Sequence, residues 1–173
     1  GRGRGLYGGG AFDSSTSPAN IAYIDVQSTG NTTTFGELTQ SSRCWIKGMG
    51  SSTRAIFAMG CGSPGTPIQN VIDYVTIAIT SNATDFGDAT FAGFARGSQS
   101  SSTRGILAGG NPTVNTMDYI TIASTGDATN FGDMLTTRWN ASADGACSST
   151  RGVWGGGANP SGRTNTMQYI QIM

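Results

Sequence analysis

The stretch that decides the fold is Met117-Asp-Tyr-Ile-Thr-Ile-Ala-Ser-Thr-Gly-Asp-Ala-Thr-Asn-Phe-Gly-Asp133. Its first six residues are mostly β-branched, aromatic or apolar, a composition that favours a strand. Ser-Thr-Gly-Asp then supplies turn chemistry, and a Phe-Gly-acid triplet follows it. The same pattern occupies residues 21–37 and 72–88, and residues 167–172 repeat its first part. The chain is therefore predicted to consist of repeats, each with a strand, a turn and a further strand.

A second recurring element is an arginine followed by apolar residues and a glycine-rich end. The four arginines are spaced by 50, 50 and 47 residues and are Arg4, Arg54, Arg104 and Arg151. They divide the chain into repeats at 1–53, 54–103 and 104–150, with a partial repeat at 151–173. Tyr and Phe are 12 residues apart in every complete copy (23 to 35, 74 to 86 and 119 to 131). Each repeat is predicted to hold four short strands, and no amphipathic helix is expected, so the fold class is all-β.

The Tyr-containing strands are apolar on both faces. In the second copy, Val75 and Ile77 lie on one face of the predicted strand, and Ile72 and Tyr74 lie on the other. The other copies have the same arrangement. A sheet that is apolar on both faces has to be covered on both sides. The glycine-rich end is expected to let its strand approach neighbours where a Cβ would clash. A four-stranded unit of roughly 50 residues with both faces buried is typical of a β-propeller blade.

These motifs resemble kelch repeats over essentially the whole chain. The matching features are the glycine-rich strand end, the Tyr of the next strand, an aromatic residue one strand later, and an arginine before the return, at Arg43, Arg96 and Arg138. The chain departs from the kelch pattern by using phenylalanine where those repeats usually carry tryptophan, at Phe35, Phe86 and Phe131. The stretch 118–133 also resembles repeats in large structural and tail-fibre proteins of marine bacteriophages. That resemblance implies a virion or extracellular location and a structural role.

Counting the repeats predicts assembly. The chain holds about three and a half repeats, whereas closed propellers usually have about four to eight blades. We expect a ring completed by other copies or by sequence outside this chain, and the alternative is an open head-to-tail stack of the same repeats. In both cases the partners are further copies or the rest of a longer chain. The residues predicted to form the core and the assembly contacts are Tyr23, Tyr74, Tyr119, Tyr169, Phe35, Phe86, Phe131, Arg4, Arg54, Arg104 and Arg151.

The four repeated arginines allow two interpretations. They could form a ring of guanidinium groups around an opening, suited to anionic ligands. Alternatively, each could pair with an acid or a carbonyl group of the adjacent blade. Their occurrence in every repeat favours the structural interpretation.

Composition argues against several classes of function. The chain has no histidine, which removes the commonest general base and the commonest zinc ligand, and Glu37 is its single glutamate. We therefore expect no enzyme activity, no cofactor and no metal. Ten basic residues balance ten acidic ones, so nucleic-acid binding is not expected, and no apolar run approaches the roughly 20 residues that span a membrane.

A carbohydrate-binding adhesin is the alternative function. Trp45 and Trp139 follow Arg43 and Arg138 in the variable connections, where aromatic rings could stack on the sugars of a cell-surface glycan. These four residues are the candidate ligand contacts. Trp154 occupies a strand position that is apolar in the other repeats and is expected in the core.

Three remaining groups of residues have a structural and a functional interpretation. Carboxylates near the turns could bind calcium but are expected to cap turns, namely Asp85, Asp88, Asp127 and Asp133. The glycosylation sequons are likewise expected to be turn residues, at Asn31, Asn82 and Asn140. The three cysteines occupy non-equivalent repeat positions and are expected to be small buried residues, at Cys44, Cys61 and Cys147.

Overall fold

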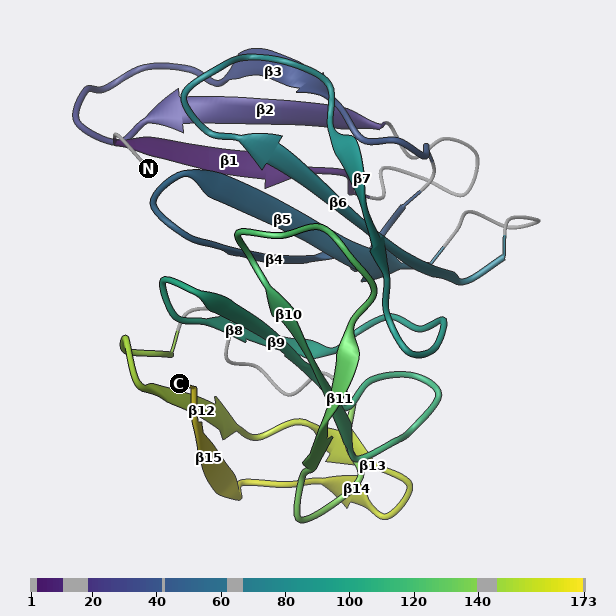
Figure 1. Ribbon diagram of the computed structural model, residues 1–173. Helices are drawn as coiled ribbons and strands as arrows, with labels where there is room; N and C mark the ends of the chain where they lie inside the picture. The colour runs from purple at the N-terminus through teal and green to yellow at the C-terminus, as the bar shows by residue number, and fades with distance from the viewer. Residues whose placement is uncertain (1–2, 11–18, 42, 62–66, 140–145, 173) are drawn as a thin grey trace.

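The computed structural model describes residues 3–10, 19–41, 43–61, 67–139 and 146–172, and in these residues the fold is all-β without a helix. These residues form five antiparallel sheets, one of them a two-stranded hairpin, and the other four follow one another along the chain, with the first and the fourth at opposite ends of the molecule (Figure 1). This confirms the all-β prediction.

Three of the sheets are meanders in which neighbouring strands are also consecutive in sequence. The first sheet contains β1 (Arg4–Gly8), β2 (Asn20–Asp25) and β3 (Thr33–Glu37). The second contains β4 (Lys47–Gly50), β5 (Arg54–Gly60), β6 (Gln69–Thr76) and β7 (Thr84–Asp88). The third contains β8 (Gly97–Ser100), β9 (Arg104–Ala108), β10 (Thr116–Thr121) and β11 (Thr129–Asp133).

The fourth sheet is smaller. It pairs β12 (Arg151–Gly155) with β15 (Met167–Gln171), and a short hairpin of β13 (Ala158–Asn159) and β14 (Gly162–Arg163) lies between them in sequence. Cys147 forms an isolated bridge with Gly152 on the far side of β12, in the place that β8 takes beside β9. Within the described part of the chain, no strand pairs with the other edge of β15.

The sheets are offset from the sequence repeats by one strand. β4 lies before Arg54, yet it pairs with β5 through residues 47–50 and 55–58. β8 pairs in the same way with β9. Each complete sheet therefore takes its first strand from the end of the preceding sequence repeat.

The Tyr and Phe residues of each repeat meet across two paired strands. Tyr74 on β6 and Phe86 on β7 have ring centroids 5.9 Å apart at an interplanar angle of 81°. The same edge-to-face contact joins Tyr23 to Phe35 at 5.9 Å and Tyr119 to Phe131 at 6.1 Å. Such pairs stabilise a sheet beyond the area that they bury. The constant spacing of 12 residues thus encodes one cross-strand contact.

The hydrophobic core lies between the sheets. One cluster joins Ile21 and Phe35 of the first sheet to Phe57 and Val75 of the second. The next joins residues of the second sheet to Leu107, Ile120 and Ile122. A third joins Ile106 and Met117 of the third sheet to Trp154 and Ile172. The apolar side chains of each sheet are consequently shielded from water by the neighbouring sheets. Trp154 is 1% exposed and lies in the core, as expected.

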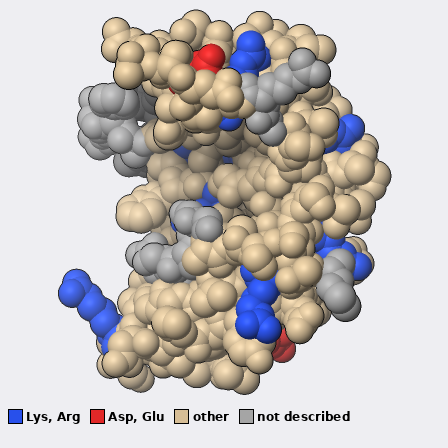
Figure 2. All heavy atoms as spheres, turned by 90° about the vertical axis from the view of Figure 1, so that its left-hand side faces the viewer, with Lys and Arg blue, Asp and Glu red and all other residues tan. Residues whose placement is uncertain are grey.

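Charged groups are sparse on the surface. On the face shown in Figure 2, the Lys and Arg atoms form separate spots on a mostly uncharged surface, with few acidic atoms among them. In the residues that the structure places, no helix has the length and apolar character needed to cross a membrane.

Candidate functional site

The turn after the Tyr-containing strand of one sheet binds the outer strand of the preceding sheet. In the second sheet, the amide of Ala83 donates to the Glu37 carbonyl of β3 at 2.7 Å. The Glu37 amide in turn donates to Oδ1 of Asn82 at 3.1 Å. We call the segments 81–83 and 126–128 the Asx turns, because each carries an Asn or Asp that caps the neighbouring sheet.

The third sheet repeats this contact against the second. Gly126 N donates to the Phe86 carbonyl at 2.7 Å, and Ala128 N donates to the Asp88 carbonyl at 2.8 Å. Oδ1 of Asp127 accepts the Asp88 amide at 3.0 Å, as Asn82 does one repeat earlier. Asn82 and Asp127 therefore accept hydrogen bonds from the preceding sheet rather than capping their own turn, whereas Asp85 accepts the Gly87 amide locally at 3.2 Å. Among the placed residues, no three carboxylates or thiols converge on a metal site. Asn140 lies outside the described residues.

The glycine of the Phe-Gly-acid triplet makes room for the Asx turn. A Cβ on Gly87 would lie 2.5 Å from the Gly126 carbonyl oxygen, and one on Gly36 would overlap the Ser81 carbonyl. A side chain at either position would force the two sheets apart. At Gly132 of β11, by contrast, nothing lies within 4 Å of the position that a Cβ would take.

The repeated arginines join adjacent sheets. Nη1 of Arg4 donates to the Ile77 carbonyl at 2.8 Å, and Nη1 of Arg54 donates to the Ile122 carbonyl at 2.9 Å. For these two residues the predicted pairing with a carbonyl of the adjacent sheet is confirmed. All four guanidinium groups also lie over the Tyr ring of their own sheet, at 4.5 to 4.9 Å from the ring centroid. Each arginine thus stabilises its Tyr by a cation–π contact.

Arg43 and Arg138 do not contact solvent, so the prediction that they bind a ligand is corrected. Both are 0% exposed, as is Arg96. The three are not equivalent in the backbone: Gly10 and Gly110 donate to the carbonyls of Arg43 and Arg138, whereas the corresponding bond from Gly60 reaches Gly93. The Arg96 side chain, three residues further along, nevertheless makes the same kind of contacts.

Each buried arginine lies in the connection that leads from one sheet to the next. Its side chain binds the strands of the sheet that follows, including the Tyr-containing strand or the residue just before it. Arg43 forms an ion pair with Asp73 and donates to the Phe57 and Val71 carbonyls. The Thr39 hydroxyl donates to the same carboxylate at 2.6 Å. The network therefore links the end of the first sheet to two strands of the second.

The third sheet carries the same network, and the fourth carries a version with an arginine but no carboxylate. Arg96 pairs with Asp118, which also accepts the Thr90 hydroxyl at 2.7 Å. Gln168 stands where Asp73 and Asp118 stand in their strands, and Arg138 instead donates to the Gly156 and Thr166 carbonyls. Burial lowers the pKa of all three arginines, and the carboxylates of Asp73 and Asp118 oppose this shift at Arg43 and Arg96.

Trp45 is the most accessible of the candidate ligand contacts. Its side chain is 59% exposed, and its backbone adopts a φ of 56°, which is uncommon for a bulky residue. Trp139 is half-buried and forms a bridge with Ala158, so the two tryptophans do not occupy equivalent positions. Only Trp45 presents most of its surface to solvent.

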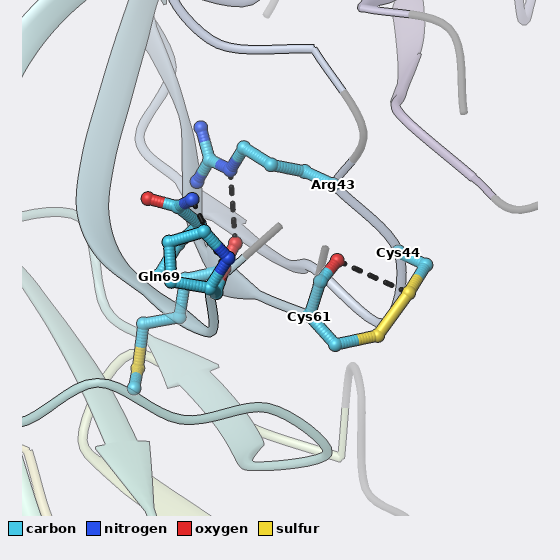
Figure 3. Close-up of a disulfide and its surroundings, with 6 residues drawn as sticks. Arg43, Cys44, Cys61 and Gln69 are labelled. Atoms are coloured by element: carbon cyan, nitrogen blue, oxygen red, sulfur yellow. Dashed lines mark hydrogen bonds between the residues drawn. A yellow bond between two sulfur atoms is a disulfide. The ribbon is translucent and has the colours of Figure 1, made fainter. Parts of the chain in front are cut away.

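A disulfide between Cys44 and Cys61 lies directly beside Trp45. Figure 3 shows the Arg43 side chain extending away from this disulfide toward Gln69. Cys44 and Cys61 also form an antiparallel bridge, and Phe94 with Asn111 forms an equivalent bridge without cysteines. The expectation that the cysteines are small buried residues holds for Cys44, which is 7% exposed, and is wrong for Cys147, which is exposed. Cys61 is half-buried and is joined to Cys44.

The Asx-turn contact predicts different costs for two matched glycine substitutions. Gly87 and Gly132 have similar positive φ values, 141° and 131°, so alanine strains both backbones alike. Only Gly87→Ala also meets the neighbouring turn, so it should lower the free energy of unfolding by about 1–3 kcal/mol more than Gly132→Ala. Urea denaturation of both variants measures the difference, and equal losses would contradict the contact.

The buried ion pair predicts a strong effect of Asp118→Ala. The substitution leaves the Arg96 guanidinium buried without a compensating charge, which should cost about 3–5 kcal/mol of unfolding free energy. Asp133→Ala, which removes an exposed carboxylate, should change stability by about 0.5 kcal/mol or less. Similar midpoints for the two variants in chemical denaturation would show that Asp118 is not essential to the network.

Comparison with known proteins yields no relative. A scan against models of protein families and a search of curated proteins both found no match. The kelch and phage resemblances stay predictions.

Proposed function

We propose that this chain is a non-enzymatic structural module that assembles through the faces and edges of its sheets. The observation that carries the proposal is the position of the core. All three hydrophobic clusters lie between neighbouring sheets, so a sheet gains its stability from the next one. The first and fourth sheets each have one neighbour within the described chain, and further copies of the chain would cover their remaining surfaces.

The sheets fit the interpretation as kelch-like propeller blades. The second and third sheets are four-stranded antiparallel meanders that follow one another in the chain, as blades do. Strand β4 contacts β8, so the first strands of the second and third sheets lie side by side, and β8 in turn contacts β12 of the fourth sheet. This arrangement is compatible with a ring around an axis and with an open stack, and we propose the ring, completed by other copies or by further sequence.

A virion tail fibre or another extracellular appendage is the proposed location. The disulfide supports it, because disulfides persist mainly in oxidising environments outside the cytosol. The resemblance of residues 118–133 to phage repeats points the same way. A repeated architecture of this kind is suited to a ring or a fibre.

A carbohydrate-binding adhesin is the second candidate, and Trp45 is the observation that favours it. An exposed indole beside a disulfide is held in place at little further entropic cost, which suits a stacking platform for a sugar. With Arg43 and Arg138 buried, a glycan would have to be recognised by Trp45 and its surrounding surface.

Self-association predicts a mass above that of the 17.8 kDa chain. Light scattering coupled to size-exclusion chromatography should give a multiple of this mass that rises with concentration. Electron microscopy then distinguishes closed rings from extended fibres. A monomer that persists over the whole concentration range would contradict assembly through further copies.

Glycan binding tests the adhesin. Trp45→Ala should abolish retention on a glycan array, because the stacking platform is lost. Tyr7→Ala is the matched control, since Tyr7 is also 59% exposed but lies on β1. Equal loss in both variants, or no binding by the unmodified chain, would count against an adhesin.

A further inference from the structure

A polar cleft of about 500 Å³ lies where the first and second sheets meet. The first sheet lines it with Arg4, Tyr23 and Asp25, together with residues of the loop that joins β2 to β3. The second sheet lines it with Ile77 and the residue that follows. The loop between β2 and β3 lies at the end of the first sheet where β1 begins (Figure 1). Both walls of the cleft therefore belong to sheets that the structure describes in contact with each other.

The Arg4 side chain is held in position at this cleft by two contacts. Its Nη1 donates to the Ile77 carbonyl at 2.8 Å, and its guanidinium carbon lies 4.7 Å from the centroid of the Tyr23 ring. The Ile77 bond uses one of the five N–H donors of a guanidinium group, and the other four have no acceptor among the described residues. A ligand would thus meet a cation that is already oriented, which lowers the entropic cost of binding.

A carboxylate stands directly opposite this cation. Asp25 on β2 is the register partner of Arg4 on β1, and its side chain is exposed. One carboxylate oxygen of Asp25 accepts the Gln27 amide at 3.0 Å, which fixes the carboxylate. Neither Arg4 nor Asp25 forms an ion pair with a residue that the structure describes. Two opposite charges consequently line one cleft without neutralising each other through direct contact.

The carboxylate is a departure from the repeat. In the other sheets, the residue opposite the repeated arginine is uncharged: Thr76 lies opposite Arg54, Thr121 opposite Arg104 and Gln171 opposite Arg151. Three sheets therefore form the same strand pair without an acid at this position. Because the fold does not require Asp25, its carboxylate is available for binding a ligand.

The chemistry of the cleft suits a sugar. Ser28 and Thr33 add exposed hydroxyl groups beside the two charges, and polar side chains make up most of the lining. Sugar hydroxyls both donate and accept hydrogen bonds, so a single sugar can satisfy a guanidinium and a carboxylate. A small zwitterion such as a free amino acid would also match the charges. It would leave most of the cleft unfilled, whereas a disaccharide is closer to the cleft in size.

We propose that the cleft between Arg4 and Asp25 is a binding site for a neutral oligosaccharide. Arg4 donates to hydroxyl groups of the sugar, Asp25 accepts from them, and the loop hydroxyls complete the site. The site differs from the surface around Trp45, which lies near the other end of β1: Gly10, just beyond β1, donates to the carbonyl of Arg43. The inference goes beyond assembly, because both walls belong to a single chain.

The experiment titrates the isotope-labelled 173-residue chain with maltose, cellobiose and lactose and follows backbone amide resonances. At least one of the three disaccharides should shift the amides of residues 24–33 and 77–78 saturably. Asp25→Thr introduces the residue that the second and third sheets carry, so it should fold, and it should weaken binding about tenfold or more. Asp25→Asn should weaken binding in the same direction. Asp133→Thr, which removes an exposed carboxylate from β11, is the matched control and should bind like the parent.

The outcomes separate this site from the proposed functions. Trp45→Ala should leave the shifts unchanged, and their loss in that variant would place the sugar at Trp45 and overturn the cleft. Saturable shifts with L-serine but with none of the disaccharides would overturn the sugar as the ligand class. Shifts that appear with no disaccharide, or that both Asp25 variants leave unchanged, overturn the site itself. A monomer that binds a disaccharide at these residues supports the site while contradicting assembly, and an oligomer that binds none overturns the site and leaves assembly in place.

Discussion

The constraint on which the structure depends is that no sheet of this protein can bury both of its apolar faces by itself. Sheets of three or four short strands expose apolar side chains above and below, and burial comes from the adjacent sheet. The clusters around Phe57, Leu107 and Trp154 each cross such a boundary. The polar contacts serve the same end, because the Asx turns and Arg4 or Arg54 tie neighbouring sheets together. Sheets that are consecutive in the sequence are therefore also neighbours in the structure.

Charge is used sparingly, and five charged residues of the described chain are buried, namely Arg43, Asp73, Arg96, Asp118 and Arg138. Arg43 and Arg96 are withdrawn completely from water and matched by one carboxylate each. Such pairs add little net stability compared with apolar residues, but removing one partner is costly, so they favour a unique arrangement of the connection. The fourth sheet shows that the arrangement can be kept without an acid: Gln168 accepts from the Leu135 amide, and Arg138 relies on carbonyl groups.

Much of the fold was predictable from the repeated Tyr-to-Phe spacing, because a regular cross-strand pair leaves a regular interval in the sequence. The role of Arg4 and Arg54 was predictable for a similar reason: repetition indicates a structural contact. The burial of Arg43 and Arg138 was missed. A signal for Arg43 existed in Asp73, which precedes the Tyr of the next strand, whereas the fourth sheet has Gln168 at that position and gives no such signal for Arg138. The Cys44–Cys61 pairing could not be inferred, since the two residues occupy different repeat positions and meet through an isolated bridge. The location of Asn82 and Asp127 in a turn was predictable, but not that they cap another sheet.

The offset between sequence repeats and sheets has a consequence for how such a chain can change in length. Since every complete sheet takes its first strand from the repeat before it, a unit gained or lost by duplication or deletion carries three strands of one sheet and the first strand of the next. The same division recurs at each junction, so the array can grow or shrink by whole units while each sheet is rebuilt from the same parts. The offset also means that each sequence repeat contributes its last strand to the sheet of the next repeat. Separating two successive repeats therefore requires that strand to be removed from the sheet.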